Sequence, residues 1–406
     1  MKSEWKVYSV QELIDLDMLE EPMDGNHGGI HPKSSDYVSS GVPFIMANNL
    51  SNGKVDYDNC AFISEQQATT LRKGFAHPGD VLLTHKATIG RTAIVGDEYD
   101  TIILTPQVTY YRVKHGISNR YLKYYFDSSE FQQTLSNWAG SGSTRAYLGI
   151  TAQRKLPIVL PPMETQEKIA GLCGALDEKI YLNNAINNNL LKQVLTLYAT
   201  QFSSLELNGC IGDYCSVKSG FAFKSSWWTN SGIRVIKIGS INQDNLNLLE
   251  CSYVDEDKAD KAKDFVVKAG DLLIAMTGAT IGKFAMVPYS SEMLLVNQRV
   301  GKFFLGNNPV EKLPFIYCTL KQPEVYGEVV NRGQGSAQPN ISASDIMSIP
   351  CVIPSQDAIN DFNNTSQPLF DLIIRNQREN QNLSELRNAL LPKLMSGELD
   401  VSDIDL

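Results

Sequence analysis

Two glycine-rich segments of this sequence resemble motifs for phosphate binding and for nucleophilic catalysis, and neither is complete. The segment GATIGK at 278–283 has one residue too few before its Gly-Lys pair for a phosphate-binding loop, and Phe284 stands where Ser or Thr would bind magnesium. The segment GSGS at 140–143 lacks the strand-to-helix Gly-x-Ser-x-Gly context of a hydrolase nucleophile. We therefore interpret both as tight connections and predict no catalytic residue in the chain.

Histidine and cysteine could together suggest a metal site, but their spacing does not support one. His27 and His31 lie near Asp24 and Asp36, in a loop rich in Gly and Pro where lone histidines are more often structural or DNA-facing. The seven cysteines are scattered and lack metal-site spacing, which favours reduced, partly buried thiols. We predict neither a metal ion nor a cofactor in this chain.

The remaining polar residues with a recognisable arrangement lie in segments that occur twice. GDVLLTHKATIGRTAIV at 79–95 returns as GDLLIAMTGATIGKFAMV at 270–287, a shift of 191 to 192 residues that becomes 193 at the later loops GSGS (from Gly140) and GQGS (from Gly333). This spacing is too long for a solenoid repeat and equals one domain plus one long helix. The same shift relates GVPFIMANNL at 41–50 to GIRVIKIGSI at 232–241, and LPIVLPP at 156–162 to IPCVIPS at 349–355. A duplicated scaffold with divergent loops suits a protein that binds two different targets.

Each copy is predicted to be an α+β domain with a dominant sheet. Segments such as VPFIMA, DVLLTH and TIILTPQVTYYRV carry β-branched and aromatic residues between turn residues. One helix is expected from Arg120 to Trp138, with Leu122, Tyr125, Phe126 and Leu135 as its apolar stripe.

Two long helices are predicted, one after each copy. Apolar residues recur at intervals of four, ten and seven in both segments, which fits a heptad seam and predicts that the helices pack against each other. The seam residues are Leu176, Ile180, Leu190 and Leu197 in the first segment and Leu369, Ile373, Leu383 and Leu390 in the second.

Asparagine and proline add two expectations for these helices. Asn187 and Asn380 fall at corresponding seam positions, and a pair there could fix the register of an antiparallel coiled coil; the alternative is that one or both face water. Pro368 predicts a break near the start of the second helix, with Thr365 or Ser366 as a new N-cap, and Pro392 predicts a kink.

Composition and charge limit the function classes. With 43% hydrophobic and 20% charged residues the chain is an ordinary globular protein, and it has neither a membrane-spanning run nor an apolar signal region. A cytoplasmic location is the default expectation. The net charge of −9 argues against nucleic acid at first sight, but 68–155 contains eleven Lys or Arg against six Asp or Glu. A local DNA-binding surface and an ordinary solvated surface are equally compatible with this charge.

At this point the residues carry a family resemblance over essentially the whole chain. Two divergent domains of about 150 residues each precede a long helix, with LPIVLPPMETQEKI after the first domain and LRNALLPKLMSGEL near the C-terminus. This arrangement resembles the specificity subunit (HsdS) of type I restriction-modification systems, and the segment from Asp24 to Leu50 resembles the start of a target recognition domain. The predicted boundaries are target recognition domains at 1–160 and 206–353 and long helices at 161–205 and 354–406.

The resemblance implies a DNA-binding subunit without catalysis of its own. Each target recognition domain would bind one half of a bipartite site in double-stranded DNA, and the helices would set the spacing and dock two methyltransferase (HsdM) subunits. Those subunits would methylate adenine with S-adenosylmethionine, and restriction (HsdR) subunits would add chemistry that uses ATP and magnesium. The chain itself has no Asn-Pro-Pro-Tyr or Asp-Pro-Pro-Tyr segment of an amino-methyltransferase.

Polar residues on the loops between strands are the candidate DNA contacts, because base edges are recognised by hydrogen bonds from side chains. In the first domain they are Thr84, His85, Lys86, Thr88, Arg91, Ser141, Ser143, Thr144, Arg145 and Tyr147. In the second domain they are Thr277, Thr280, Lys283, Arg332, Gln334, Ser336, Gln338 and Asn340. Gln338 corresponds to Arg145, which suggests a different half-site.

A second class of function stays open at this stage. A protein of the same build could act as a scaffold or inhibitor that binds methyltransferase subunits without recognising specific DNA. Specific DNA binding would distinguish the two classes.

Overall fold

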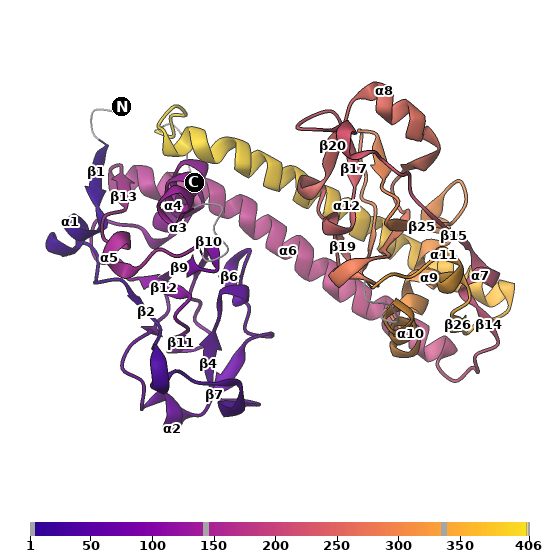
Figure 1. Cartoon of the computed structure of the whole chain (residues 1–406), viewed down its shortest axis with the longest axis horizontal. Coiled ribbons are helices and arrows are strands. Elements are labelled where there is room, and N and C mark those ends of the chain that lie inside the picture. Colours follow the sequence, from indigo (N-terminus) through magenta and orange to yellow (C-terminus); the bar gives the residue numbers. More distant parts are fainter. Residues whose placement is uncertain (1–4, 141–145, 334–338, 403, 405–406) are drawn as a thin grey trace. The chain divides into compact units, whose positions relative to one another are not determined.

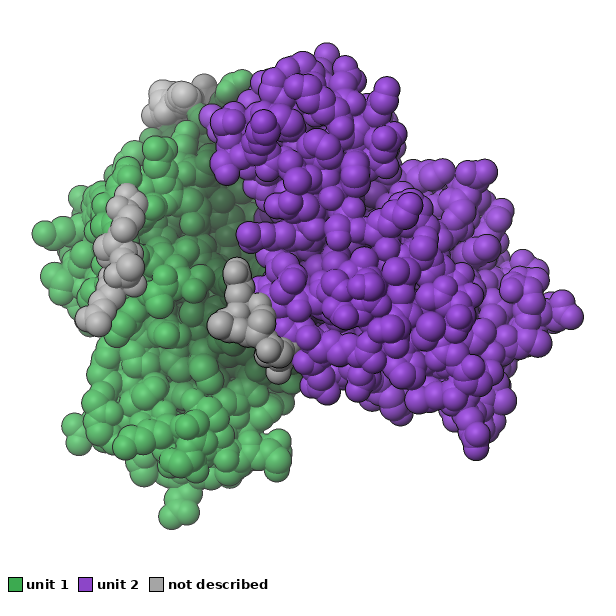
Figure 2. Space-filling view, turned by 45° about the vertical axis from the view of Figure 1, so that its right-hand side comes forward, with its two compact units in different colours: residues 1–177, 385–406 green, residues 178–384 purple. Residues whose placement is uncertain are grey.

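The computed structural model describes residues 5–140, 146–333, 339–402 and 404. The chain divides into two compact units (Figure 2). Unit 1 combines residues 1–177 with residues 385–406, and unit 2 consists of residues 178–384. Among the described residues, no helix is both long and apolar enough to cross a membrane.

Two mixed sheets form the body of unit 1 (Figure 1). The six-stranded sheet has the order β2 (Met23–Asp24), β12 (Val108–Tyr111), β9 (Val81–Lys86), β10 (Thr88–Ile94), β6 (Gly53–Val55), β5 (Leu50–Ser51). The five-stranded sheet has the order β3 (Tyr37–Val38), β7 (Ala61–Ile63), β4 (Val42–Ile45), β11 (Ile102–Leu104), β8 (Phe75–Ala76). A separate antiparallel pair joins β1 (Lys6–Ser9) to β13 (Pro157–Leu160). The central strands are buried on both faces, which is why VLLTH and VTYY are almost continuous apolar runs.

The helices of unit 1 differ from the prediction in one respect. Instead of one helix from Arg120 to Trp138 there are two, α3 (Asn119–Asp127) and α4 (Ser129–Trp138). Ser128 lies between them with extended backbone (ψ 145°), and its Oγ accepts a hydrogen bond from the Phe131 amide at 3.3 Å. The serine is thus the N-cap of α4, and its side chain competes with continuation of the helix. The short helices are α1 (Val10–Asp15), α2 (Glu65–Ala68) and α5 (Ile150–Gln153).

Unit 2 repeats this architecture in the same order of strands. Its five-stranded sheet is β16 (Trp228–Thr229), β20 (Ser252–Val254), β17 (Ile233–Ile236), β24 (Leu294–Val296), β21 (Val266–Val267), and β17 and β24 are parallel, as β4 and β11 are in unit 1. The second sheet is β15 (Ser216–Ser219), β25 (Val300–Phe304), β22 (Leu272–Ala275), β23 (Phe284–Met286). Unit 2 also contains two separate antiparallel pairs, β14 (Gly209–Cys210) with β26 (Pro350–Cys351) and β18 (Ile241–Asn242) with β19 (Asn245–Leu246). Its helices are α7 (Ile211–Tyr214), α8 (Glu256–Ala259), α9 (Leu313–Leu320), α10 (Pro323–Gly333) and α11 (Ala343–Met347).

Two helices of 40 residues each follow the globular parts, α6 (Met163–Phe202) and α12 (Gln356–Met395). Within unit 2 they run antiparallel, because Asn183 contacts Asn380 while the later Asn187 contacts the earlier Asn376. The mixed sheets and the long helices confirm the predicted α+β class.

The predicted break near Pro368 is wrong. Helix α12 runs without interruption from Gln356 to Met395, and Ser355, not Thr365 or Ser366, is at its start, where the Ser355 Oγ accepts from the Ala358 amide at 3.3 Å. The Pro368 ring is exposed, so its bulk meets solvent rather than a packed neighbour. The helix loses one backbone hydrogen bond there but keeps its apolar face buried. The kink at Pro392 stays a prediction.

Candidate nucleic-acid interface

In unit 1 the hairpin of β9 and β10 carries five of the ten predicted DNA contacts, and three of these five have exposed side chains. Lys86 pairs with Thr88 across a turn whose central residue, Ala87, has a positive φ of 66°. The side chains of Lys86, Thr88 and Arg91 are exposed. The hairpin therefore offers two cations and a hydroxyl group to solvent within six residues of sequence.

The chain that follows the glycine-rich loop lies along this hairpin. Tyr147 forms a β-bridge with Lys86, and the Ala87 amide donates to the Ala146 carbonyl at 3.2 Å. The Lys86 Nζ lies 5.8 Å from the centroid of the Tyr147 ring, which is 49% exposed. Lys86 and the exposed ring of Tyr147, both predicted DNA contacts, thus lie on one surface. Ser141, Ser143, Thr144 and Arg145 lie outside the described residues.

Thr84 and His85 do not present their side chains on that surface, because both are fully buried beneath the hairpin. The Thr84 Oγ1 accepts from the Arg91 amide at 2.9 Å, and the His85 Nδ1 lies 3.0 Å from the Leu148 carbonyl. The expectation that they contact DNA directly is therefore not supported by their placement. They hold the hairpin and the Tyr147 segment together.

His85 belongs to a small polar cluster around the buried carboxylate of Asp24. The His85 Nε2 is 4.0 Å from the Asp24 Oδ2, and His27 and Lys73 also contact this carboxylate, His27 at 2.8 Å. Burial lowers the pKa of His85, and the Asp24 carboxylate opposes part of that shift. His31 packs its ring against Phe44 instead. Within the described ranges no group of His, Cys, Asp or Glu is placed to hold a metal ion.

Unit 2 places its candidate residues in the same way. Thr277 forms a β-bridge with Asn340, and the Gly278 amide donates to the Pro339 carbonyl at 3.0 Å. These contacts match those of Lys86 with Tyr147, so in both units the end of the glycine-rich loop lies along the same hairpin. In unit 2 the turn is a single 3₁₀ turn, η9 (Gly278–Thr280). Gln334, Ser336 and Gln338 lie outside the described residues.

The remaining candidates in unit 2 differ in how available their side chains are. Thr277 and Thr280 each bury a hydroxyl oxygen that has no hydrogen-bond partner among the described residues. Lys283 corresponds to Arg91 and is half-buried. Arg332 is already engaged: its guanidinium contacts the Glu328 carboxylate at 3.0 Å and the Ser348 Oγ at 2.7 Å. It holds α10 to α11.

A second segment next to each hairpin was not among the predicted contacts. In unit 1 the Arg91 Nη1 donates to the carbonyl of Ala47 at 3.4 Å, the first residue of η4 (Ala47–Asn49). In unit 2 a Cβ at Gly278 would lie 3.8 Å from the Cδ1 of Ile238, the first residue of η6 (Ile238–Ser240). The repeat of GVPFIMANNL as GIRVIKIGSI marks this segment in the sequence, but duplication alone does not distinguish a contact segment from scaffold.

The predicted helix asparagines do not bond to each other; Asn187 is buried and Asn380 is half-buried. The Asn187 Oδ1 accepts from the Asn376 Nδ2 at 2.8 Å, and the Asn380 Oδ1 accepts from the Asn183 Nδ2 at 2.9 Å. In the repeat, Asn187 corresponds to Asn380 and Asn183 corresponds to Asn376, at a shift of 193 residues. Each of the two hydrogen bonds is therefore the repeat equivalent of the other. The expected pair of Asn187 with Asn380 is therefore replaced by two equivalent pairs, one on each side of a local twofold axis in the helix pair.

Comparison with known proteins agrees with this duplicated architecture. The model of the type I restriction modification DNA specificity domain matches residues 2–192 and again residues 207–380. These two matches cover most of the chain, so the protein belongs to the family of type I restriction-modification DNA specificity proteins and carries two such domains in tandem.

Particular relatives span nearly the whole chain. The MjaIX specificity subunit of Methanocaldococcus jannaschii, a type I restriction enzyme subunit, is 26% identical over 93% of this chain and 91% of its own length. The MjaVIII specificity subunit of the same organism is 20% identical over 99% and 94%. The crystal structure of the type I restriction-modification S subunit from M. genitalium shares the fold, with a TM-score of 0.51, 14% identity and 96% coverage of each chain.

Proposed function

We propose that this protein directs a type I restriction-modification complex to a bipartite DNA site, with each unit's globular domain recognising one half. One observation carries the proposal. Both domains place a β-hairpin and the end of a glycine-rich loop side by side, through equivalent bridges at Lys86–Tyr147 and Thr277–Asn340, and equip them with different side chains. Two domains that share a backbone arrangement but differ in their exposed polar side chains can recognise two different half-sites.

The exposed residues suit contacts in the major groove of duplex DNA. Lys86 can donate to guanine O6 and N7, and Tyr147 adds an aromatic face beside the lysine. In unit 2, Asn340 is exposed and can make the paired contacts that suit adenine. Thr84 and His85 would support this surface from below.

The long helices would set the distance between the half-sites and dock methyltransferase (HsdM) subunits. A helix of 40 residues is roughly 60 Å long at about 1.5 Å per residue, and half-sites one turn apart need roughly 34 Å. The S-adenosylmethionine, ATP and magnesium of such a complex would be bound by the methyltransferase and restriction (HsdR) subunits. Truncation after Ile374 removes part of α12 and should abolish capture of methyltransferase in a pull-down.

Methylation mapping tests the proposal directly. We would coexpress the chain with a type I methyltransferase subunit in a methylation-deficient host and sequence N6-methyladenine across the genome. A single split motif with a fixed gap is the expected result. Exchange of residues 1–160 for those of a relative should then change one half only, while Lys86→Gln should relax specificity within that same half.

A stable complex without methylation would contradict the proposal and favour the scaffold or inhibitor. The control is Arg332→Gln, because Arg332 is held by Glu328 and Ser348 and should leave both halves of the motif unchanged.

A further inference from the structure

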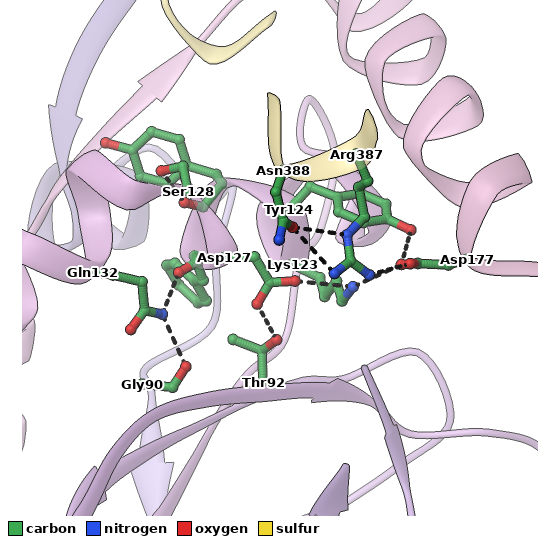
Figure 3. Close-up of polar contacts among 12 residues, drawn as sticks. Gly90, Thr92, Lys123, Tyr124, Asp127, Ser128, Gln132, Asp177, Arg387 and Asn388 are labelled. Atoms are coloured by element: carbon green, nitrogen blue, oxygen red, sulfur yellow. Dashed lines mark hydrogen bonds and ion pairs between the residues drawn. The ribbon is translucent and has the colours of Figure 1, made fainter. Parts of the chain in front are cut away.

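Unit 1 contains a polar pocket of about 500 Å³ beside the β9–β10 hairpin. Five parts of the chain line it: Asn48 of η4, the β5–β6 hairpin, Gly90–Thr92 of β10, helices α3 and α4, and Arg387, Asn388 and Leu391 of α12. Figure 3 shows the side chains of α3, α6 and α12 that meet there. Arg91, an exposed residue of the hairpin, lies on its wall.

A chain of ion pairs forms one side of this pocket (Figure 3). The buried Lys123 Nζ lies 2.9 Å from the Asp127 carboxylate and 3.3 Å from the Asp177 carboxylate, and Arg387 contacts the other oxygen of Asp177. Burial by itself would raise the pKa of Asp177, but Lys123 and Arg387 more than offset this and hold the pKa below its usual value. The Asp177 carboxylate is therefore ionised and already neutralised by lysine and arginine, and the Asp127 carboxylate is paired with Lys123.

In unit 2 the counterparts of these charged side chains are apolar, and a different ion pair, Asp244 with Lys321, lies beside the Tyr317 hydroxyl. With the shift of the repeat, Thr92 and Asp177 become Phe284 and Phe370, whose rings lie 5.4 and 5.2 Å from that of Tyr317, the counterpart of Tyr124. Lys123 and Arg387 become Ile316 and Val194, both buried. A buried ionic cluster is often no more stable than apolar residues of similar volume. The two-carboxylate, two-cation arrangement at this place is therefore particular to unit 1.

The cations of the pocket outnumber its carboxylates. Lys123 and Arg387 balance Asp127 and Asp177, and Arg91 adds one further positive charge. Arg387 is 29% exposed, and the Asn388 Oδ1 accepts from its Nε and Nη2, which leaves the Asn388 amide nitrogen as a donor. Two guanidinium groups and one amide, with no unbalanced carboxylate among the described lining residues, suit a phosphate group.

We infer that this pocket binds a backbone phosphate of the duplex whose bases face the β9–β10 hairpin, with Arg387 and Arg91 as its donors. The inference rests on the proposed function and assigns a DNA contact to the end of a long helix. It applies to unit 1 only, because Val194 replaces Arg387 in unit 2. Asp177 is a positioning residue that holds Arg387 without touching the DNA.

The test measures binding of the full-length chain to a fluorescein-labelled duplex of mixed sequence at several salt concentrations. Each phosphate neutralised contributes about −0.9 to the slope of log K against log salt. Arg387→Gln should reduce the magnitude of this slope by about one and weaken binding at low salt roughly tenfold. Arg120→Gln is the matched control: it removes one arginine of α3 that donates to the Ala170 carbonyl and should leave the slope unchanged.

Asp177→Asn separates a phosphate site from a structural ion pair. If Arg387 binds phosphate, this variant frees the guanidinium, so DNA binding should become tighter while the slope stays at least as steep. If the ion pair only supports the fold, Asp177→Asn and Arg387→Gln should weaken binding equally and lower the melting temperature together, which would overturn the inference. An unchanged slope for Arg387→Gln would also overturn it. A wild-type chain that binds no duplex would instead overturn the proposed function itself.

Discussion

At the scale of single residues, His85 shows how one position differs between the two domains. Its counterpart in unit 2 is Met276, and both are buried and accept the same backbone hydrogen bond, from Leu148 at 3.0 Å and from Ile341 at 2.9 Å. The methionine has no titratable group, whereas the histidine carries an imidazole next to Asp24. The residue beneath the hairpin can therefore titrate in unit 1, whereas its counterpart in unit 2 cannot.

The sign of this linkage follows from burial. The pKa of His85 is lowered in the folded protein, so as pH falls below about 6.5 the unfolded chain takes up a proton that the folded chain does not. The stability of unit 1 should therefore decrease as pH falls, by about 1.4 kcal/mol for each unit of pKa difference. His85→Met should flatten part of this dependence, measured as melting temperature between about pH 7.5 and about pH 5.5. His31, whose pKa is also lowered by burial, accounts for a remaining part. An equal pH dependence in the variant would contradict the assignment to His85.

At the scale of elements, the asparagine pairs bind α6 to α12 within unit 2. Asn187 is 6% exposed and Asn376 is 8% exposed, so their amides depend on each other rather than on water. Buried amides that must be matched favour one register of the helices over others, at some cost in stability.

Asn187→Leu should destabilise unit 2 by about 1 to 3 kcal/mol, because it leaves the buried Asn376 amide without a partner. The double variant Asn187→Leu with Asn376→Leu should recover most of that loss, since both polar groups are then removed together. A double-mutant cycle from chemical denaturation gives the coupling energy. Asn188→Leu, on the exposed face of α6, is the control and should change stability by less than about 0.5 kcal/mol. Additive losses in the double variant would show that the pair carries no coupling.

Pro368 gives a second prediction for α12. An interior proline costs a helix about 3 kcal/mol, chiefly through a lost backbone hydrogen bond and a steric clash. Because Pro368 is exposed and the helix continues through it, Pro368→Ala should raise the stability of unit 2 by up to that amount. Thermal denaturation measures the change. A destabilised variant would mean that the proline fixes a bend that packing in unit 2 requires.

Sequence reasoning predicted the elements that repeat and failed where a local choice depends on tertiary contacts. The shift of 191 to 193 residues locates both domains, and heptad spacing locates both long helices, because these signals extend over many residues. Ser128 ends a helix that periodicity alone would continue, and Pro368 does not end one. Thr84 and His85 are polar residues near the end of the apolar strand β9, so nothing local reveals that the Tyr147 segment covers them.

At the scale of the whole molecule, the two units have separate cores. The core of unit 2 joins α6 and α12 to α9 through a set of aromatic rings, among them Phe362, Phe370 and Tyr317. The core of unit 1 uses smaller groups from the helices, such as Ala170, Cys173 and Leu391. Because the cores are separate, we expect the two units to unfold in separate transitions.

Calorimetry should accordingly resolve more than one unfolding transition. Phe370→Ala creates a cavity in unit 2 and should lower one transition by about 3 to 5 kcal/mol while the other stays in place. Leu372→Ala, at a residue 42% exposed on the same helix, should shift neither. A uniform shift of all transitions by Phe370→Ala would show that the two units unfold as one.

The division of the chain also fixes the order in which its parts can fold during synthesis. Leu391, Leu394 and Met395 belong to the core of unit 1, yet a ribosome makes them only after all of residues 178–384. At about 5 to 20 residues per second, the first domain waits roughly 10 to 40 s for these side chains. The domain that is made first is therefore finished last, and its incomplete apolar face is open to chaperones while unit 2 folds.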